Sequence, residues 1–321
     1  MARQRETKEL LRELSQTAER RTVFVLGETD TGKTTLVSEI AKSLLTSSEV
    51  VWIDGDPGQS VIGPPATVGS ALLSRGSGSP RSPGGSRGGT LPEKRAQEVR
   101  LRFVGGVSPV RHLLQMTVGI GGLVRAARRD HPDAHIVVDS CGFVTGPVAE
   151  EFQYSLIDLL RPDILVILDR GSAVHRIAAS FAGQGGPRIA WVRPPRAVRK
   201  RNTEERAAYR KRRLAHYFAD MVEESLSLGD RGIHGHVPRE QAAGGYDSGW
   251  KNRLVAFLDA EQFVLSLGVV EDAEPGEHLA DLSFRLKLPA DQEDAPKRAA
   301  SIQVGSTKLE GVELLNGTRR G

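Results

Sequence analysis

The sequence predicts an α/β fold: a P-loop NTPase parallel sheet flanked by helices, with a small β-rich C-terminal domain. Three observations predict it. A glycine-rich loop at residues 27–34 directly follows an apolar run, apolar runs then alternate with helical segments, and this alternation stops near Leu226. Continuous β-branched runs that alternate with helices are typical of parallel sheets buried on both faces.

The elements follow from the spacing of apolar residues along the chain. A short amphipathic helix is expected over residues 8–20, before the first strand. Strands are expected at 22–26, 50–54, 135–139, 164–168 and 188–192, and helices at 33–45, 110–129, 148–160 and 173–181. Later strands are expected at 254–258 and 263–267, with weaker signals at 279–288 and 300–304.

We therefore divide the chain into an N-terminal helix (1–20), a P-loop domain (21–225) and a C-terminal domain (226–321). Residues 74–92 are rich in Gly, Ser, Pro and Arg. Such a composition cannot bury a core, so we expect a disordered surface insert within the P-loop domain.

Composition restricts the class of protein. Cys141 is the only cysteine, which excludes an intramolecular disulfide and a zinc site built on several cysteines. No apolar run approaches the length of a membrane span, and the charged N-terminus has no apolar segment after it as a secretory signal has. These observations predict a cytoplasmic protein without a membrane partner.

The loop at residues 27–34 has the complete phosphate-binding pattern G-x4-G-K-T. A strand, a glycine-rich turn and a helix N-terminus direct backbone N–H groups at one point, where a phosphate binds. Lys33 is expected to reach the β- and γ-phosphates, and Thr34 to bind Mg²⁺. The predicted nucleotide contacts are Gly27, Glu28, Thr29, Asp30, Thr31, Gly32, Lys33, Thr34 and Thr35.

Carboxylates follow two of the predicted strands. Asp54 and Asp56 end the strand at 50–54, and Asp139 ends the strand at 135–139. Parallel strands place these ends at the edge where ligands bind. Of Asp54 and Asp56, one could hold Mg²⁺ and the other could accept a proton from an attacking hydroxyl, whereas Asp139 fits the Mg²⁺-holding position of a P-loop enzyme. The alternative for 54–58 is a turn without a chemical role.

A short turn, Ser140-Cys141-Gly142-Phe143, follows Asp139. Its hydroxyl and backbone amides suit a second phosphate, and the Phe143 ring could stack on a base. A nucleophilic role for Cys141 has no support, because the sequence offers it no partner base.

The segment 196–218 is rich in arginine and is predicted to form a lid. Arg206, Arg210 and Arg213 share one helical face by their spacing, while Leu214, Phe218 and Met221 can anchor the other side. Guanidinium groups over a phosphate loop stabilise charge on a phosphoryl group in transfer. The alternative is a solvated basic helix.

Taken together, these motifs resemble the P-loop polynucleotide 5′-hydroxyl kinase family. That family has the phosphate loop, then D-x-D-x-G-Q, then T-x-G-W, then an arginine-rich lid ending in Tyr-Phe. The chain has Asp54 to Gln59 for the second motif and Ser140 to Phe143 for the third, with Ser for Thr and Phe for Trp. Residues 105–109, which include Ser108, are similar to a family segment between these motifs, and the resemblance covers about residues 20–220.

The resemblance implies ATP and Mg²⁺ as cofactors and the 5′ end of RNA or DNA as the partner. Asp56 would be the general base, acting with Lys33, Arg201 and Arg206 in catalysis. The metal site would comprise Thr34, Asp54 and Asp139. The residues implied in substrate binding are Gln59, Ser108, Ser140, Gly142, Phe143, Arg210 and Arg213.

Two other functions remain open at this point. One is a non-catalytic ATP-binding scaffold of an RNA-processing assembly, although the lid arginines and both carboxylates argue against lost catalysis. The other is a different P-loop ATPase or GTPase that acts on proteins. The guanine signature Asn-Lys-x-Asp does not occur in the sequence, so GTP is not favoured.

Overall fold

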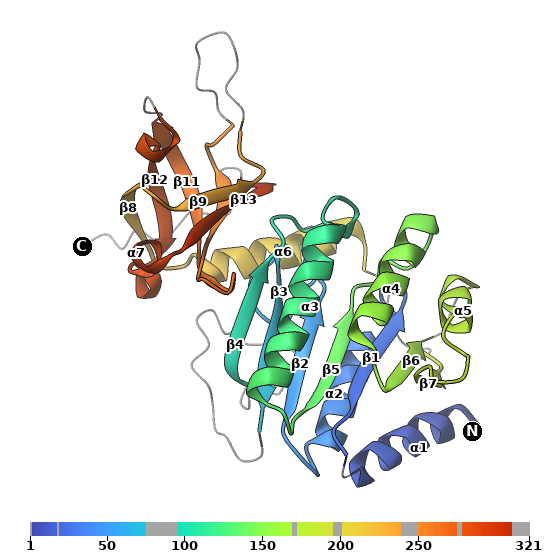
Figure 1. Ribbon diagram of the computed structural model, residues 1–321. Helices are drawn as coiled ribbons and strands as arrows, with labels where there is room; N and C mark the ends of the chain where they lie inside the picture. The colour runs from blue at the N-terminus through green and yellow to red at the C-terminus, as the bar shows by residue number, and fades with distance from the viewer. Residues whose placement is uncertain are drawn as a thin grey trace.

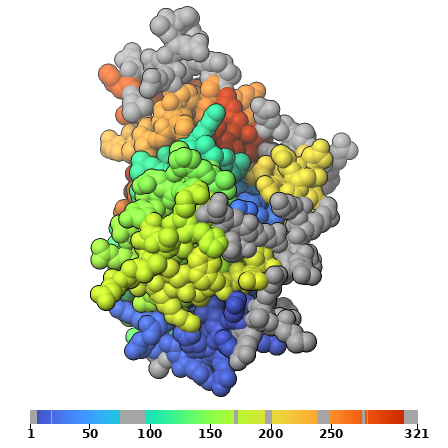
Figure 2. All heavy atoms as spheres, turned by 90° about the vertical axis from the view of Figure 1, so that its right-hand side faces the viewer, coloured from blue at the N-terminus to red at the C-terminus, as the bar shows by residue number. Residues whose placement is uncertain are grey.

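The computed structural model describes residues 2–17, 19–74, 96–168, 172–194, 201–238, 249–274 and 278–309. They form two sheets, and the first carries helices on both faces (Figure 1). Figure 2 turns the molecule to show the N-terminal residues, in blue, at the opposite end from the second sheet, in orange and red. The predicted fold class is confirmed. The described residues include no helix long and apolar enough to cross a membrane.

The first sheet has the strand order β4-β3-β2-β5-β1-β6-β7. Five of its strands are parallel: β1 (Thr22–Gly27), β2 (Val50–Gly55), β5 (His135–Ser140), β6 (Ile164–Leu168) and β7 (Arg188–Val192). Each is a short apolar run, and the four inner ones are buried along their whole length, as in a sheet covered on both faces. All five were predicted to within one residue.

Helices cover both faces of this sheet. On one face α1 (Ala2–Gln16) and α2 (Lys33–Leu44) pack against side chains such as Val23 and Val25. On the other lie α3 (Leu113–Asp130), α4 (Pro147–Leu160) and α5 (Ser172–Ala179), packed against Phe24 and Leu26. The predicted helices are confirmed apart from the first, which begins and ends earlier than residues 8–20.

The sheet is not wholly parallel, which corrects one expectation. Two further strands, β3 (Thr67–Leu73) and β4 (Ala96–Phe103), pair antiparallel at the β2 edge. Strand β4 mixes polar and apolar residues, and Glu98 is exposed on it, as is usual at the edge of a sheet. Leu73 and Ala96 are paired, so the chain leaves and re-enters the sheet at neighbouring positions. The predicted insert at 74–92 falls, apart from Ser74, outside the described residues.

The second sheet has the order β8-β12-β11-β10-β13-β9 and is mostly antiparallel. Its strands are β8 (Met221–Ser227), β9 (Gly232–Gly235), β10 (Arg253–Leu258), β11 (Val264–Glu274), β12 (Ser283–Pro289) and β13 (Ser301–Lys308). The four strands expected from apolar runs are confirmed. The polar strands β8 and β9 at the two edges were missed.

Helix α6 (Thr203–Tyr217) runs over the carboxyl edge of the first sheet toward the second (Figure 1). Its last turn is buried with strands of the second sheet in one apolar cluster that includes Leu214, Tyr217 and Phe218. The Tyr217 hydroxyl donates to Gln292 Oε1 at 2.8 Å and accepts from the Leu267 backbone N–H at 3.0 Å. The second sheet therefore fixes the C-terminal end of this helix.

Tyr217→Phe should lower the free energy of unfolding by about 1–3 kcal/mol, because it leaves the buried Leu267 N–H without its acceptor. Urea denaturation measures this loss. Tyr154→Phe, at a tyrosine that is 41% exposed, is the matched control and should stay close to the parent protein. Equal stability of the two variants would contradict a stabilising role for the Tyr217 hydroxyl.

His135, at the start of β5, predicts a pH dependence of stability. Its Nδ1 accepts from the Arg21 N–H at 3.0 Å, so Nε2 carries the proton and donates to Ser47 Oγ. Burial, and then Arg21, lower the pKa of His135. Below about pH 6.5 the unfolded chain takes up a proton that the folded chain does not. The contribution of His135 to stability should therefore fall as the pH drops from 7 to 5, whereas the buried Asp54 and Asp139, with raised pKa values, contribute in the opposite direction. The difference in stability between the parent protein and His135→Gln should accordingly change over this interval in thermal denaturation, in the direction of a relative loss for the parent at pH 5.

Candidate active site

The ends of β1, β2 and β5 meet at the carboxyl edge of the first sheet. Asp54 of β2 pairs with Asp139 of β5, and Asp139 is in turn level with Val25 of β1, two residues before the phosphate loop. The strand order β2-β5-β1 thus brings the two predicted carboxylate motifs and the loop to one place. This is the arrangement that the parallel pattern of the sequence predicted.

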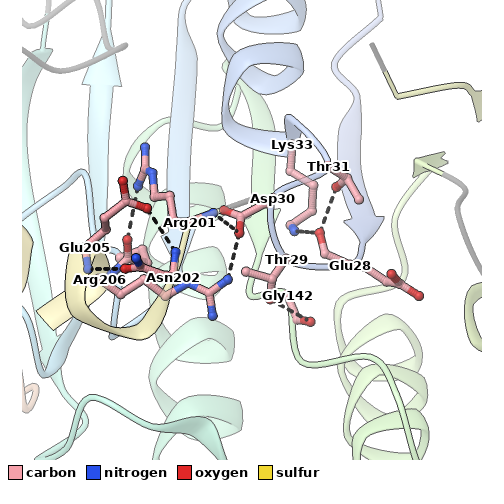
Figure 3. A network of polar contacts seen from close by, with 11 residues as sticks. Glu28, Thr29, Asp30, Thr31, Lys33, Gly142, Arg201, Asn202, Glu205 and Arg206 are labelled. Carbon is pink, nitrogen blue, oxygen red and sulfur yellow. Dashed lines mark hydrogen bonds and ion pairs between the residues drawn. The ribbon is translucent and has the colours of Figure 1, made fainter. Parts of the chain in front are cut away.

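The phosphate loop closes between β1 and α2. Gly32 caps α2 at φ 90°, and Asp30 also has a positive φ, of 55°. Lys33 Nζ donates to the Glu28 carbonyl oxygen at 2.7 Å, and Thr31 Oγ1 donates to the same atom at 2.8 Å (Figure 3). Burial lowers the pKa of Lys33, while Asp139 and Asp56 act in the opposite direction. Thr35 is exposed in the first turn of α2, where backbone N–H groups have no partner within a helix and an anion is favoured.

Thr34 and Asp139 form a pair beneath this loop. Thr34 Oγ1 donates to Asp139 Oδ2 at 2.7 Å, whereas the buried Asp139 Oδ1 has no hydrogen-bond partner. Burial raises the pKa of Asp139 to about 6. A buried carboxylate oxygen without a donor is a costly arrangement that a bound cation would relieve.

Asp54 holds the loop that follows β2. Its Oδ2 accepts from the backbone N–H groups of Val61 and Ile62, at 2.6 and 3.0 Å, and its Oδ1 accepts from that of Asp56. Burial, followed by Asp139, raises the pKa of Asp54 to about 7. Both carboxylate oxygens accept hydrogen bonds from the backbone of the loop after β2, so Asp54 stabilises this loop. Its role in binding a metal stays a prediction.

Asp56 lies within that loop and organises a tight turn. Its Oδ1 accepts from the N–H groups of Gly58 and Gln59, both at 2.9 Å. Gly58 leaves no room for a side chain, because a Cβ there would lie 2.6 Å from the Val107 carbonyl oxygen. The turn thus packs against residues 105–109, where Ser108 is exposed.

The Ser140–Phe143 turn rests directly on the phosphate loop. Thr29 Oγ1 donates to the Gly142 carbonyl oxygen at 3.3 Å (Figure 3). Ser140 is buried, and Phe143 is half-buried against the core. Burial raises the pKa of Cys141 to about 12, so this thiol is not poised as a nucleophile.

Gln153, on α4, supports this turn and was missed by the sequence analysis. Its Nε2 donates to the Phe143 carbonyl oxygen at 2.9 Å, and its side chain is fully buried. The sequence feature that could have identified Gln153 is a single amide side chain on the apolar face of the helix predicted at 148–160. A buried amide at such a position needs partners, and its Nε2 finds one in the turn, whereas its buried Oε1 has no hydrogen-bond partner.

Gly142→Ala should lower the free energy of unfolding by about 1–3 kcal/mol and weaken nucleotide binding, because the new Cβ would lie 2.2 Å from Thr29 Oγ1. Urea denaturation and nucleotide titration check both effects. Gly183→Ala is the matched control, since nothing lies within 4 Å of a Cβ at Gly183. A Gly142 variant as stable as the control would contradict the tight packing of the turn on the loop.

The lid reaches the phosphate loop through Asp30. Arg206 Nη2 and the Arg201 backbone N–H donate to Asp30 Oδ2 at 2.7 and 3.0 Å, and Arg201 Nη1 donates to Gln59 Oε1 at 3.1 Å (Figure 3). Asn202 and Glu205 form a reciprocal capping box that starts α6 at this point. Arg201 and Arg206, the two lid arginines expected to act in catalysis, therefore lie beside the phosphate loop, and both donate to Asp30.

The other lid arginines differ in their surroundings. Arg213 Nη2 donates to the carbonyl oxygens of Gly63 and Val61, at 2.7 and 3.3 Å, so it secures the loop after β2. The Tyr209 hydroxyl donates to the Ser60 carbonyl oxygen of the same loop. Arg210 is half-exposed on α6. Substrate contacts by Arg210 and Arg213 stay predictions, and residues 195–200 of the lid lie outside the described residues.

The family described as "mRNA cleavage and polyadenylation factor CLP1 P-loop" matches residues 27–220, more than half of the chain. The chain belongs to this family. The match begins at the first glycine of the phosphate loop and ends just after the lid, so it contains every motif described above. Membership in this P-loop family implies that the protein uses a nucleotide.

Curated relatives are archaeal proteins named polyribonucleotide 5′-hydroxyl-kinase. That of Thermococcus kodakarensis is 29% identical over 75% of this chain and 68% of its own length. That of Methanocaldococcus jannaschii is 27% identical over 66% of this chain, and that of Pyrococcus horikoshii 29% over 50%. The matches span 54% and 40% of these last two relatives, so this chain aligns with about half of their length.

Solved structures with the same fold include two of Clp1p with Pcf11p. One is of the wild-type Clp1p–Pcf11p complex and covers 95% of this chain and 79% of that chain, with a TM-score of 0.64 and 14% identity. The other describes an extended interface between Pcf11p and Clp1p; its TM-score is 0.66, also at 14% identity. At this identity the likeness concerns the fold.

Proposed function

We propose that the protein is an ATP-dependent polynucleotide 5′-hydroxyl kinase that transfers the γ-phosphate of ATP to the 5′ end of RNA or DNA. The observation that carries the proposal is the position of Arg206 and Arg201 on Asp30 of the phosphate loop, beside the Asp56 turn. Phosphate-binding, charge-stabilising and proton-accepting groups thereby share one edge. The names of the archaeal relatives favour RNA as the acceptor.

In the proposed reaction the 5′-hydroxyl oxygen bonds to the γ-phosphorus while the bond from that phosphorus to the β–γ bridging oxygen breaks. The hydroxyl proton passes to the Asp56 carboxylate, and ADP leaves with the bond electrons. Lys33 and the lid arginines stabilise the negative charge on the transferred group. Because Asp56 Oδ1 is already held by Gly58 and Gln59, its carboxylate is oriented before the substrate binds.

The residues present fit a Mg²⁺ ion. Thr34 supplies a hydroxyl, and the unpartnered Asp139 Oδ1 supplies a buried carboxylate oxygen. In the described part of the chain no three His, Cys, Asp or Glu side chains cluster as a metal cage. Mg²⁺ bound with a nucleotide usually takes phosphate oxygens and water as further ligands, and here the ion would neutralise charge on the β- and γ-phosphates.

The acceptor end would bind between the Ser140–Phe143 turn and the loop that holds Gln59, with Ser108 at its border. Phe143 keeps a ring for stacking but lacks the indole N–H of the family's tryptophan. The second candidate function is a non-catalytic ATP-binding scaffold. It is favoured by one observation, that Arg206 forms an ion pair with Asp30 of the phosphate loop itself.

The decisive experiment incubates the protein with γ-labelled ATP and a 5′-hydroxyl oligoribonucleotide or oligodeoxyribonucleotide, beside Lys33→Ala and Asp56→Ala. We expect label on the oligonucleotide with the parent protein and none with either variant. ATP binding without transfer to RNA or DNA would overturn the kinase proposal in favour of the scaffold. Transfer to a nucleoside alone would indicate a metabolite kinase.

A further inference from the structure

Two stacked rings lie near the carboxyl edge of the first sheet, outside the residues assigned so far. The Trp191 indole of β7 and the His175 imidazole of α5 have centroids 4.5 Å apart and planes 26° from parallel. Trp191 is 39% exposed, whereas the other two tryptophans, Trp52 and Trp250, are buried. Figure 2 faces this side of the molecule, with the α4, α5 and β7 residues in green to yellow-green across its middle.

The sheet register relates this pair to the phosphate loop. Leu26, the residue before Gly27, pairs with Ile167 of β6, and Ile167 pairs with Trp191. Trp191 is therefore level with the start of the loop and two strands away, about 10 Å at the usual strand spacing. In a nucleoside triphosphate, the ribose and the α-phosphate span a distance of this size between the base and the phosphates bound in the loop.

The polar groups of the site determine which way a nucleotide points. Asp139 lies at the end of β5, the Ser140–Phe143 turn continues from it, and Asp56 follows β2. Both strands are on the same side of β1 and its loop. A terminal phosphate that reacts there points toward β5. The base must then leave the loop on the other side, toward β6 and β7, where Trp191 lies.

We propose that Trp191, backed by His175, is the stacking platform for the base of the bound nucleotide. This inference rests on the proposed function only for the direction of the terminal phosphate. Stacking engages the face of a ring and is tolerant of base identity. The platform therefore predicts that ATP and GTP bind within a few-fold of each other, while inorganic tripolyphosphate gains nothing from it.

Titration of ATP, GTP and inorganic tripolyphosphate tests the platform with the full chain. Trp191→Ala should weaken ATP binding about tenfold or more and leave tripolyphosphate binding unchanged. Trp191→Phe should keep most of the affinity, because it keeps a ring. The matched control is Tyr154→Ala, at another exposed aromatic that stacks on Phe181, and it should bind ATP as the parent does.

Fluorescence gives a second readout on the unaltered protein. ATP should quench the exposed Trp191 and tripolyphosphate should not, and Trp191→Phe should abolish the quenching. Equal ATP affinity in Trp191→Ala and the parent, or parallel losses of ATP and tripolyphosphate, would overturn the platform. These measurements detect nucleotide binding and not phosphoryl transfer. A protein that fails to phosphorylate oligonucleotides could still bind the base on Trp191, and a protein that does phosphorylate them could bind the base elsewhere.

Discussion

Arg206→Ala should reduce the rate of phosphoryl transfer to a 5′-hydroxyl oligonucleotide by roughly 10³–10⁵-fold, the range for an arginine that stabilises the transferred phosphoryl group. Arg206 donates to Asp30 in the middle of the phosphate loop, and its Nε is buried without a partner. The guanidinium therefore lies beside the loop with one N–H group unpaired, and we expect it to contact a terminal phosphate bound there. Initial rates at saturating ATP measure the effect.

The matched control is Arg212→Ala, since Arg212 is exposed on the same helix. It should change the rate little, whereas Arg206→Lys should stay far below the parent because an ammonium lacks the two-pronged geometry of the guanidinium. If Arg206→Ala lost no more activity than Arg212→Ala, the lid would have no part in the chemical step.

Asp56→Asn should lower the transfer rate by roughly 10²–10⁴-fold, the usual contribution of a general base. Asparagine keeps a side-chain oxygen for the N–H groups of Gly58 and Gln59, so the turn should survive. What it loses is the ability to take the proton of the attacking hydroxyl. Rates measured with labelled ATP, together with ATP affinity, separate this chemical loss from a structural one.

Unchanged ATP affinity with a lost transfer rate is the expected pattern. Asp220→Asn, at an exposed carboxylate beyond α6, serves as the control for loss of one negative charge. A transfer rate in Asp56→Asn within tenfold of the parent would assign the proton to another acceptor.

The fold was predictable where burial leaves a strong mark on the sequence. The strands from Val50 and His135 are apolar throughout because helices cover both faces. Strand β3 was missed although it is buried throughout, because Gly69 and Ser70 interrupt its apolar run. Strand β4 and the edge strands β8 and β9 were missed because polar residues interrupt their apolar pattern. These strands form because they hydrogen-bond to neighbouring strands, which their own residues do not reveal.

The site divides in the same way. The phosphate loop and the residues after β2 and β5 are local patterns, so the sequence shows them directly. The link from Asp30 to Arg206 joins residues 176 positions apart, and Gln153 reaches the Phe143 turn from another helix. For Asp54 the sequence pattern suggested a chemical role, because Asp56 lies two residues away. The structure shows instead that Asp54 accepts hydrogen bonds from the backbone N–H groups of Val61 and Ile62 and so holds the loop after β2.

The pairing of Leu73 with Ala96 makes the β3–β4 junction a natural place to engineer the chain. Because the two strand ends already lie side by side, closing the connection costs little extra for each added residue. A short hairpin turn, a purification tag or a small fluorescent domain could replace the segment between them while leaving the sheet register intact. Such a fusion would report on the protein in cells from the outer edge of the sheet, where β4 is four strands away from β1 and its phosphate loop.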